Sequence, residues 1–212
     1  MRIYEKGNFE LFAKDVLEFV LYNEYYGKLK KEVCDKPDFQ TVDNSMGIEF
    51  TLVGDYDYFR ATGIYQDGIY DEKDSSKIKK YEEEVKSCGW LIDEQGFSTK
   101  AWGTNDVIIW IKKSFDKKIK ELQNYANFLN YRLLMWGAQN LVDYKNPEIL
   151  KYLLDFFIQN NTKEKGYSLV YYFTFRYYIL FDLVAKEFKV IEFDEDTIDK
   201  IKKIFLRHKH HE

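Results

Sequence analysis

Two acidic residues on either side of a predicted turn are the first candidates for chemistry in this sequence. Asp43-Asn44 has the composition of a two-residue hairpin turn, because both residue types tolerate positive φ angles. A hairpin over 38–53 would place Asp38 directly opposite Glu49. Opposed residues have Cβ atoms about 4.5–5.5 Å apart, so the carboxylates would repel each other unless a divalent cation lay between them. Removal of one charge by Asp38→Ala is therefore expected to leave the melting temperature equal or slightly higher.

The alternation of residue types gives this hairpin two different faces. One face is apolar and carries Phe39, Met46, Ile48, Phe50 and Leu52. The other face is polar and carries Asp38, Gln40, Glu49 and Thr51. If the apolar face packs on the core, the carboxylates share the polar face with Gln40, which can orient a water molecule. The alternative is an exposed hairpin with acids at its rim, since Pro-Asp pairs are common in turns.

A lysine in the next predicted helix, 105–128, can reach these carboxylates. Steps of three and four residues along the helix give one seam: Ile108, Ile111, Phe115, Lys118, Leu122 and Tyr125. A lysine on a core-facing seam needs an acidic partner, and Lys118 would bring positive charge to Asp38 and Glu49. Lys117 is the second candidate for this position. The alternative is that Lys118 extends to solvent while Ile119 fills the core.

The elements around these residues predict an α/β domain of the α+β kind, with a central mixed sheet flanked by helices. Helical periodicity marks the ranges 8–30, 147–159 and 196–208, and apolar runs predict strands at 131–137 and within 168–193. A charged helix at 71–86 falls inside an expected insertion, 54–104. We therefore expect a single domain, 1–212, with a core at 10–137 and a C-terminal helix, strands and closing helix at 138–212.

The run Lys36-Pro37-Asp38-Phe39, followed by Glu49-Phe50-Thr51, resembles the PD-(D/E)XK, or restriction-endonuclease-like, nuclease superfamily. Members carry an Asp on one strand and Glu-x-Lys on the next, and their core order of helix, hairpin, helix and strand matches the predicted elements. The resemblance implies that Asp38 and Glu49 bind Mg²⁺, or Mn²⁺ in its place, for phosphodiester hydrolysis. Thr51 stands where the family has its lysine. As in divergent members, the resemblance gives the lysine's role to the next helix, at Lys118.

The same resemblance implies further site residues and a substrate. Many members add a carboxylate from the first helix, for which Glu18 and Glu24 are the candidates here. The implied substrate is nucleic acid, with DNA preferred to RNA. One basic and aromatic cluster lies around the second helix: Trp102, Trp110, Lys112, Lys113, Lys117, Lys118 and Lys120. It either lines a groove for a phosphate backbone or is an ordinary solvated helix face.

Composition limits the possible classes of protein. Hydrophobic residues make up 45% and aromatic residues 18%, which excludes general disorder. Lys plus Arg total 32 against 36 Asp plus Glu, so the formal charge of −4 gives no overall basic field. Cys34 and Cys88 lack the paired spacing of a zinc site or disulfide framework. Without an apolar leader or spanning segment, the sequence predicts a cytoplasmic protein with no membrane partner.

Three functional hypotheses follow from these residues. The first is a divergent Mg²⁺-dependent endonuclease or exonuclease. The second keeps the restriction-endonuclease-like fold but lacks catalysis, because Thr51 replaces the lysine. Such a protein would be a protein-binding or self-assembly module, with a homodimer as the simplest case. The third is an unrelated α+β binding domain with an accidental hairpin match. The position of Lys118 relative to Asp38 and Glu49 separates the first two.

Overall fold

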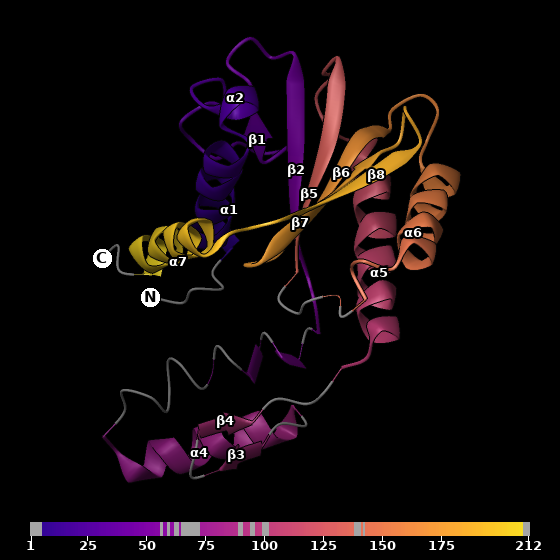
Figure 1. The fold of residues 1–212 in the computed structure, drawn as a ribbon. Coiled ribbons are helices and arrows are strands. Elements are labelled where there is room, and N and C mark those ends of the chain that lie inside the picture. Colours follow the sequence, from indigo (N-terminus) through magenta and orange to yellow (C-terminus); the bar gives the residue numbers. More distant parts are fainter. Residues whose placement is uncertain are drawn as a thin grey trace.

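A six-stranded mixed sheet with helices on both faces forms the main body of the protein (Figure 1). This computed structural model describes residues 6–55, 57–58, 60–61, 64, 73–88, 91–93, 96–98, 102–137, 141 and 143–209. The strands are β1 (Phe39–Gln40), β2 (Met46–Val53), β5 (Asn130–Gly137), β6 (Tyr167–Phe173), β7 (Tyr177–Asp182) and β8 (Glu187–Glu192), in the order β1-β2-β5-β6-β7-β8. β2, β5 and β6 run parallel, whereas β1, β7 and β8 pair antiparallel with their neighbours. The α+β class predicted from sequence is confirmed, and the C-terminal strands extend the central sheet.

Two helical layers enclose this sheet, each with its own core. On one face lie α1 (Lys6–Val20), α2 (Tyr22–Tyr25) and α7 (Glu195–Lys209). On the other face lie α5 (Thr104–Leu122) and α6 (Pro147–Asn160). Side chains along β5 alternate between the two cores, because successive residues of a strand point to opposite faces. Trp136 packs with the α1 side and Met135 with the α5 side.

The hairpin has the predicted register but a different turn. Phe39 pairs with Ile48 and Gln40 with Gly47, which is the pairing that places Asp38 opposite Glu49. The backbone N–H of Thr41 donates to the Met46 carbonyl, so the connection spans residues 42–45 and is longer than the predicted two-residue turn. Asn44 has a φ of 55°, whereas Asp43 is not among the positive-φ residues. Asp43 instead accepts hydrogen bonds from the backbone and hydroxyl of Ser45.

The first helix is shorter than the sequence pattern predicts. α1 ends at Val20, and α2 covers only Tyr22–Tyr25 instead of continuing to Lys30. Gly27 then adopts a φ of 69°, a left-handed conformation that ends helical geometry. This reversal brings Leu29 beside Thr41, where the two residues form an isolated antiparallel bridge. The segment after α2 therefore runs along the hairpin edge.

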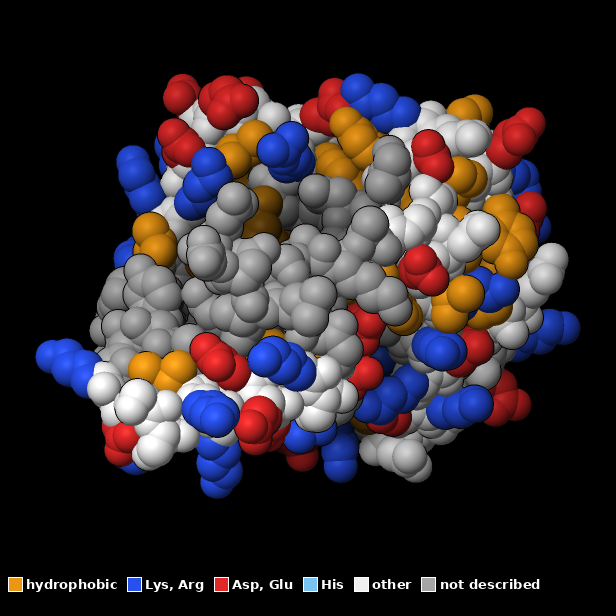
Figure 2. All heavy atoms as spheres, turned by 90° about the horizontal axis from the view of Figure 1, so that it is seen from below, with side chains coloured by type: hydrophobic (Ala, Val, Ile, Leu, Met, Phe, Trp, Pro, Cys, Tyr) orange, Lys and Arg blue, Asp and Glu red, His pale blue; other side chains and the backbone are white. Residues whose placement is uncertain are grey.

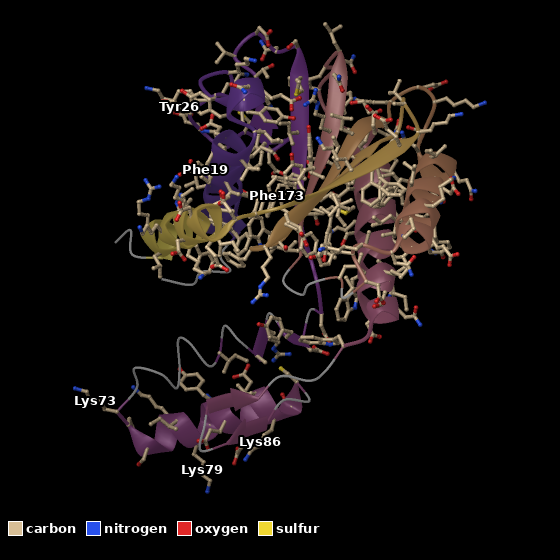
Figure 3. All side chains as sticks on the ribbon, viewed as in Figure 1. Phe19, Tyr26, Lys73, Lys79, Lys86 and Phe173 are labelled. Carbon is tan, nitrogen blue, oxygen red and sulfur yellow. The ribbon has the colours of Figure 1, made fainter. Side chains whose placement is uncertain are left out.

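The segment between β2 and α5 leaves the sheet and returns to it. Within it the structure describes α4 (Ser75–Ser87), β3 (Leu91–Asp93) and β4 (Gly96–Ser98), of which sequence analysis predicted only the helix. Asp74 caps α4 by accepting from the Ser76 N–H at 2.9 Å. Lys79 and Lys86 project outward from this helix (Figure 3).

Candidate functional site

Asp38 and Glu49 are both buried on the α5 side of the sheet. Asp38 is 6% exposed and Glu49 is 3% exposed. Glu49 lies in the middle of β2, and the observed register places Asp38, just before β1, across from it. One oxygen of Asp38, Oδ2, accepts a hydrogen bond from the Phe50 N–H at 2.8 Å. The hairpin therefore holds two carboxylates in one buried volume, as the sequence pattern predicts.

Lys118 reaches this carboxylate pair from α5. Its side chain is 11% exposed, and its ammonium forms an ion pair with Glu49 Oε1. The same ammonium lies 3.2 Å from Oε2 of Glu121, one helical turn further along α5. The structure thus places Lys118 at the carboxylate pair and not in solvent. Ile119 is also buried, so both neighbouring positions of the helix contact the interior.

The electrostatics of Glu49 reflect burial opposed by a cation. Burial raises the pKa of Glu49 to about 7, and the nearby charge of Asp38 acts in the same direction. The charge and hydrogen bond of Lys118, with a smaller contribution from the Tyr125 hydroxyl, lower the pKa but do not restore its usual value. Glu49 is consequently a carboxylate whose protonation changes near neutral pH.

Lys118 remains a cation in this environment. Burial alone would lower the pKa of its ammonium, whereas the charge of Glu49 and the hydrogen bond to it raise that pKa. Asp38 and Glu121 add to this effect, and the result is a pKa above the ordinary value. An ammonium has three donors. One of them bonds to Glu49, and Glu121 lies within ion-pair distance of the same ammonium.

Three residues at this cluster had not been assigned to it from sequence. Glu121 positions the Lys118 ammonium, and the Tyr125 hydroxyl lies near Glu49. Tyr167 of β6 donates to the Lys118 carbonyl at 3.2 Å. Glu121 and Tyr125 follow Lys118 by three and seven residues, which is the spacing of one helix face. This spacing is the sequence signal that could have assigned them to the cluster. Tyr167 comes from a distant strand and has no such signal.

One specific observation indicates that Asp38 and Glu49 suit a divalent cation. Oε1 of Glu49 is bonded to Lys118, but no described residue donates to its buried Oε2 within hydrogen-bonding geometry. A buried carboxylate oxygen without a partner is costly unless a proton or cation neutralises it. Within the part of the chain that the structure describes, no group of three or more His, Cys, Asp or Glu residues could hold a metal. A cation here would therefore take its remaining ligands from water or substrate.

The other candidate site residues lie elsewhere or have other partners. Gln40 accepts from Lys30 at 2.8 Å and donates to the Pro37 carbonyl at 3.3 Å. Thr51 is half-buried on the same side as Glu49, and its hydroxyl donates to the Leu52 carbonyl at 3.4 Å. The neighbouring lysine, Lys117, has a side chain that is 72% exposed and lies 3.9 Å from Glu121. The structure therefore places Lys118, and not Lys117, against Glu49.

The two acidic candidates of the first predicted helix are not brought to the site. Glu18 lies on α1, where Lys14 and Asp15 are its charged neighbours and burial raises the pKa of its carboxyl. Glu24 lies on α2 and forms an ion pair with Arg132. Both helices cover the sheet face opposite α5, whereas Glu49 lies on the α5 side. The structure therefore places neither Glu18 nor Glu24 beside Glu49.

Arg132 is the centre of a second polar cluster, on the opposite face of the sheet. It pairs with Glu24 and contacts the hydroxyls of Tyr25 and Tyr171, which lie 2.9 Å apart. Burial raises the pKa of Tyr171 to about 12, so its hydroxyl stays neutral. Arg132 pairs in register with Ile48, whose side chain belongs to the α1-side core. The sheet therefore separates this cluster from Glu49.

The basic and aromatic cluster predicted around α5 is divided by the structure. Lys112 donates to the Tyr152 hydroxyl at 2.8 Å and lies over the Phe156 ring, so it connects α5 to α6. Trp102 and Trp110 contact each other edge to face at 5.7 Å. Lys113, Lys117 and Lys120 are exposed. These residues do not form one basic face.

Comparisons of the chain with family models, curated proteins and solved structures each found no match. None of the described helices is long and apolar enough to cross a membrane. Both cysteines, Cys34 and Cys88, are free thiols. The class of protein defined by fold and site is thus an α+β domain with a buried cluster of two carboxylates and a lysine.

Proposed function

We propose that this protein is a divergent, metal-dependent nuclease of the restriction-endonuclease-like fold, which hydrolyses phosphodiester bonds in DNA in preference to RNA. The observation that carries the proposal is the buried Oε2 of Glu49, which lacks a described hydrogen-bond donor beside Asp38 and Lys118. Two carboxylates and substrate phosphates are a common ligand set for Mg²⁺. The residue pattern that resembles the nuclease superfamily occupies this same position.

The side chains of the cluster have distinct parts in the proposed reaction. Asp38 and Glu49 would hold Mg²⁺, which supplies an activated water molecule and charge neutralisation when bound. Lys118 would place its positive charge beside a non-bridging phosphate oxygen, where a fixed positive charge favours the transition state. Glu121 holds the Lys118 ammonium in position. Lys118 thereby takes the role of the lysine that Thr51 replaces.

Access for a substrate is supported by the exposure of the cluster's outer residue. The Glu121 side chain is 38% exposed, whereas Glu49 and Lys118 beside it are buried. The cluster therefore opens toward solvent at Glu121. Figure 2 shows the opposite end of the molecule, where α5 begins, and the described basic and acidic side chains on that face are intermixed, so no field of one sign covers it. Binding of nucleic acid would depend on local contacts and on the cation.

The first experiment is calorimetric titration with Mn²⁺ and Mg²⁺. The wild type is compared with Glu49→Gln, which removes the carboxylate but keeps the side-chain shape. Glu18→Gln is the matched control, because it removes a half-buried carboxylate elsewhere. Stoichiometric binding by the wild type and Glu18→Gln, lost in Glu49→Gln, supports the site and leads to cleavage assays on duplex DNA, single-stranded DNA and RNA. Equal binding by all three proteins contradicts it.

A second candidate function has one observation in its favour. Thr51 stands where the resembled superfamily has its lysine, and its hydroxyl donates to the neighbouring Leu52 carbonyl at 3.4 Å, as expected of a fold that has lost catalysis. The protein would then be a protein-binding or self-assembly module, with a homodimer as the simplest case. Absence of cation binding and of cleavage, together with concentration-dependent sedimentation, supports this second function over the first.

A further inference from the structure

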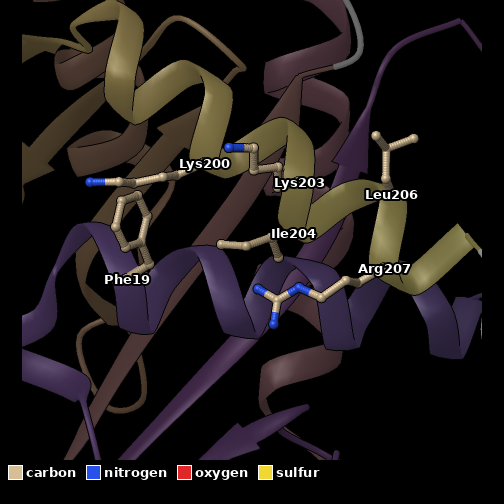
Figure 4. A pocket seen from close by; sticks show the side chains of 6 residues that line it. All are labelled: Phe19, Lys200, Lys203, Ile204, Leu206 and Arg207. Atoms are coloured by element: carbon tan, nitrogen blue, oxygen red, sulfur yellow. The ribbon is translucent and has the colours of Figure 1, made fainter.

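A pocket between α1 and α7 lies on the opposite side of the sheet from Glu49. Its volume is about 700 Å³, within the range of about 300–1,000 Å³ that is typical of ligand pockets. Phe19 lines it from α1, and Lys200, Lys203, Ile204, Leu206 and Arg207 line it from α7 (Figure 4). Leu206 is 49% exposed, whereas Ile204 is 5% exposed. The pocket therefore has an apolar floor that opens to the surface.

Basic groups surround this apolar floor. Lys200, Lys203 and Arg207 follow one another at intervals of three and four residues, so they share one face of α7. The Lys200 ammonium lies 5.9 Å from the centre of the Phe19 ring. Among the described residues, no ion pair involves Lys203 or Arg207. The rim thus carries positive charge that a partner with carboxylates can neutralise.

Two acidic residues near the pocket along these helices have other partners. Asp15 of α1 is bonded to His208 at 2.9 Å, which joins the two helices beyond the pocket. Asp199 of α7 lies 3.3 Å from Lys202. Among the described residues, neither of these acids nor Glu18 beside Phe19 forms an ion pair with Lys203 or Arg207.

We infer that the α1–α7 pocket docks an amphipathic helix of a partner protein, with apolar side chains entering the pocket and acidic side chains beside Lys203 and Arg207. An apolar helix face in a groove with a charged rim is a recurring mode of recognition. The sheet lies between this pocket and Asp38 and Glu49, so a bound partner leaves the carboxylate cluster uncovered.

Two other occupants fit the observations less well. A single-stranded nucleic acid needs exposed aromatic faces for its bases, but the Lys200 ammonium already lies over the Phe19 ring. A second copy of the same surface would place Lys203 and Arg207 against like charges, which opposes association. An acidic amphipathic helix satisfies both the apolar floor and the basic rim.

The test uses a fluorescein-labelled helical peptide of about 20 residues, with leucines along one face and glutamates beside them. Fluorescence anisotropy measures its binding to the wild type, to Lys203→Glu/Arg207→Glu and to Leu206→Ser. These residues are exposed, and circular dichroism verifies that each variant is folded. Lys163→Glu is the control, because it reverses an exposed charge outside the pocket. A peptide with lysines in place of glutamates controls for charge.

Saturable binding of the acidic peptide to the wild type and to Lys163→Glu is the expected result. We expect the double charge reversal to weaken it at least about tenfold, and added salt to weaken it as well. Leu206→Ser should weaken it without changing the salt dependence. Absence of binding to the wild type, or equal binding by the double variant, overturns the inference. A labelled single-stranded DNA that binds through Lys203 and Arg207 while the peptide does not also overturns it.

Discussion

Lys118 and Glu49 form a buried ion pair between α5 and β2, although they lie 69 positions apart in the sequence. Neither side chain would be stable in this position alone, because an unpaired buried charge is costly. The pair therefore ties helix to sheet at the place where the candidate cation site lies. The consequences of changing each partner can be measured separately from catalysis.

Replacement of Lys118 by methionine is expected to destabilise the protein by about 3–5 kcal/mol at about pH 8, because Glu49 stays buried without its cation. The loss should be smaller at about pH 5, where Glu49 is protonated. Urea unfolding measures both values. Lys117→Met is the control, since this neighbouring side chain is 72% exposed and its replacement should change stability by less than about 0.5 kcal/mol. Equal effects of the two substitutions would contradict the assigned burial.

The pH dependence of stability provides a second measurement on the same residue. The pKa of Glu49 is raised from 4.5 to about 7, so between these values the folded state keeps a proton that the unfolded state has lost. The stability that this group contributes is full below about pH 4.5 and is lost as the pH rises toward about 7, by at most about 1.4 kcal/mol per pH unit. Urea unfolding across this range should show the decrease in the wild type and in Glu121→Gln. Glu49→Gln should lack it.

Asp38→Asn and Asp38→Ala should behave differently. Asn keeps an oxygen that can accept from the Phe50 N–H and removes the charge that repels Glu49, so stability should be unchanged or higher. Ala leaves this buried N–H without its partner, at a cost of about 1–3 kcal/mol. The sequence alone led us to expect an equal or higher melting temperature for Asp38→Ala, because it gave no sign of this hydrogen bond. Both variants should lose Mn²⁺-dependent cleavage, and a variant that cleaves like the wild type would refute the role of Asp38.

Arg132→Met should destabilise the protein by about 2–3 kcal/mol without changing cation binding. The substitution leaves Glu24 and two buried tyrosine hydroxyls without their cationic partner. Arg176→Met makes the same change at an exposed turn and should have little effect. Differential scanning fluorimetry with and without Mn²⁺ measures both properties. Loss of the Mn²⁺ response in Arg132→Met would show that the two faces of the sheet are coupled.

The hairpin register and the position of Lys118 could be predicted from the sequence, because each follows from a residue pattern that repeats within a few positions. Alternation of apolar residues identified the core face of the hairpin, and the helical seam identified Lys118. Burial of Phe39, Ile48 and Phe50 confirms the first prediction. The strand predicted at 131–137 and the helix predicted at 147–159 are confirmed, with observed bounds of Asn130–Gly137 and Pro147–Asn160.

Features that depend on contacts between segments far apart in the sequence could not be predicted. Arg132 lies in an apolar strand, and nothing near it in the sequence indicates that Glu24 is its partner. The bridge between Leu29 and Thr41 joins the segment after the first helix to the hairpin, and the helical period of 8–30 gives no sign of it. Tyr167 joins the Lys118 cluster from β6 by the same kind of long-range contact. The periodicity of residue types indicates the structure of one helix or strand at a time and contains no information on such pairings.

The long connection between β2 and α5 has a consequence for how this chain can change in evolution. Val53 at the end of β2 and Val107 near the start of α5 belong to the same core, so the intervening chain leaves and returns at one place. Tyr58, Ala61, Val85, Cys88 and Trp102 form a small apolar cluster of their own within it. The entropy of closing such a loop grows slowly, by about 0.6 kcal/mol for each doubling of length. Lineages can therefore lengthen, shorten or exchange this segment at little thermodynamic cost, while Glu49 and Lys118 on either side keep their places.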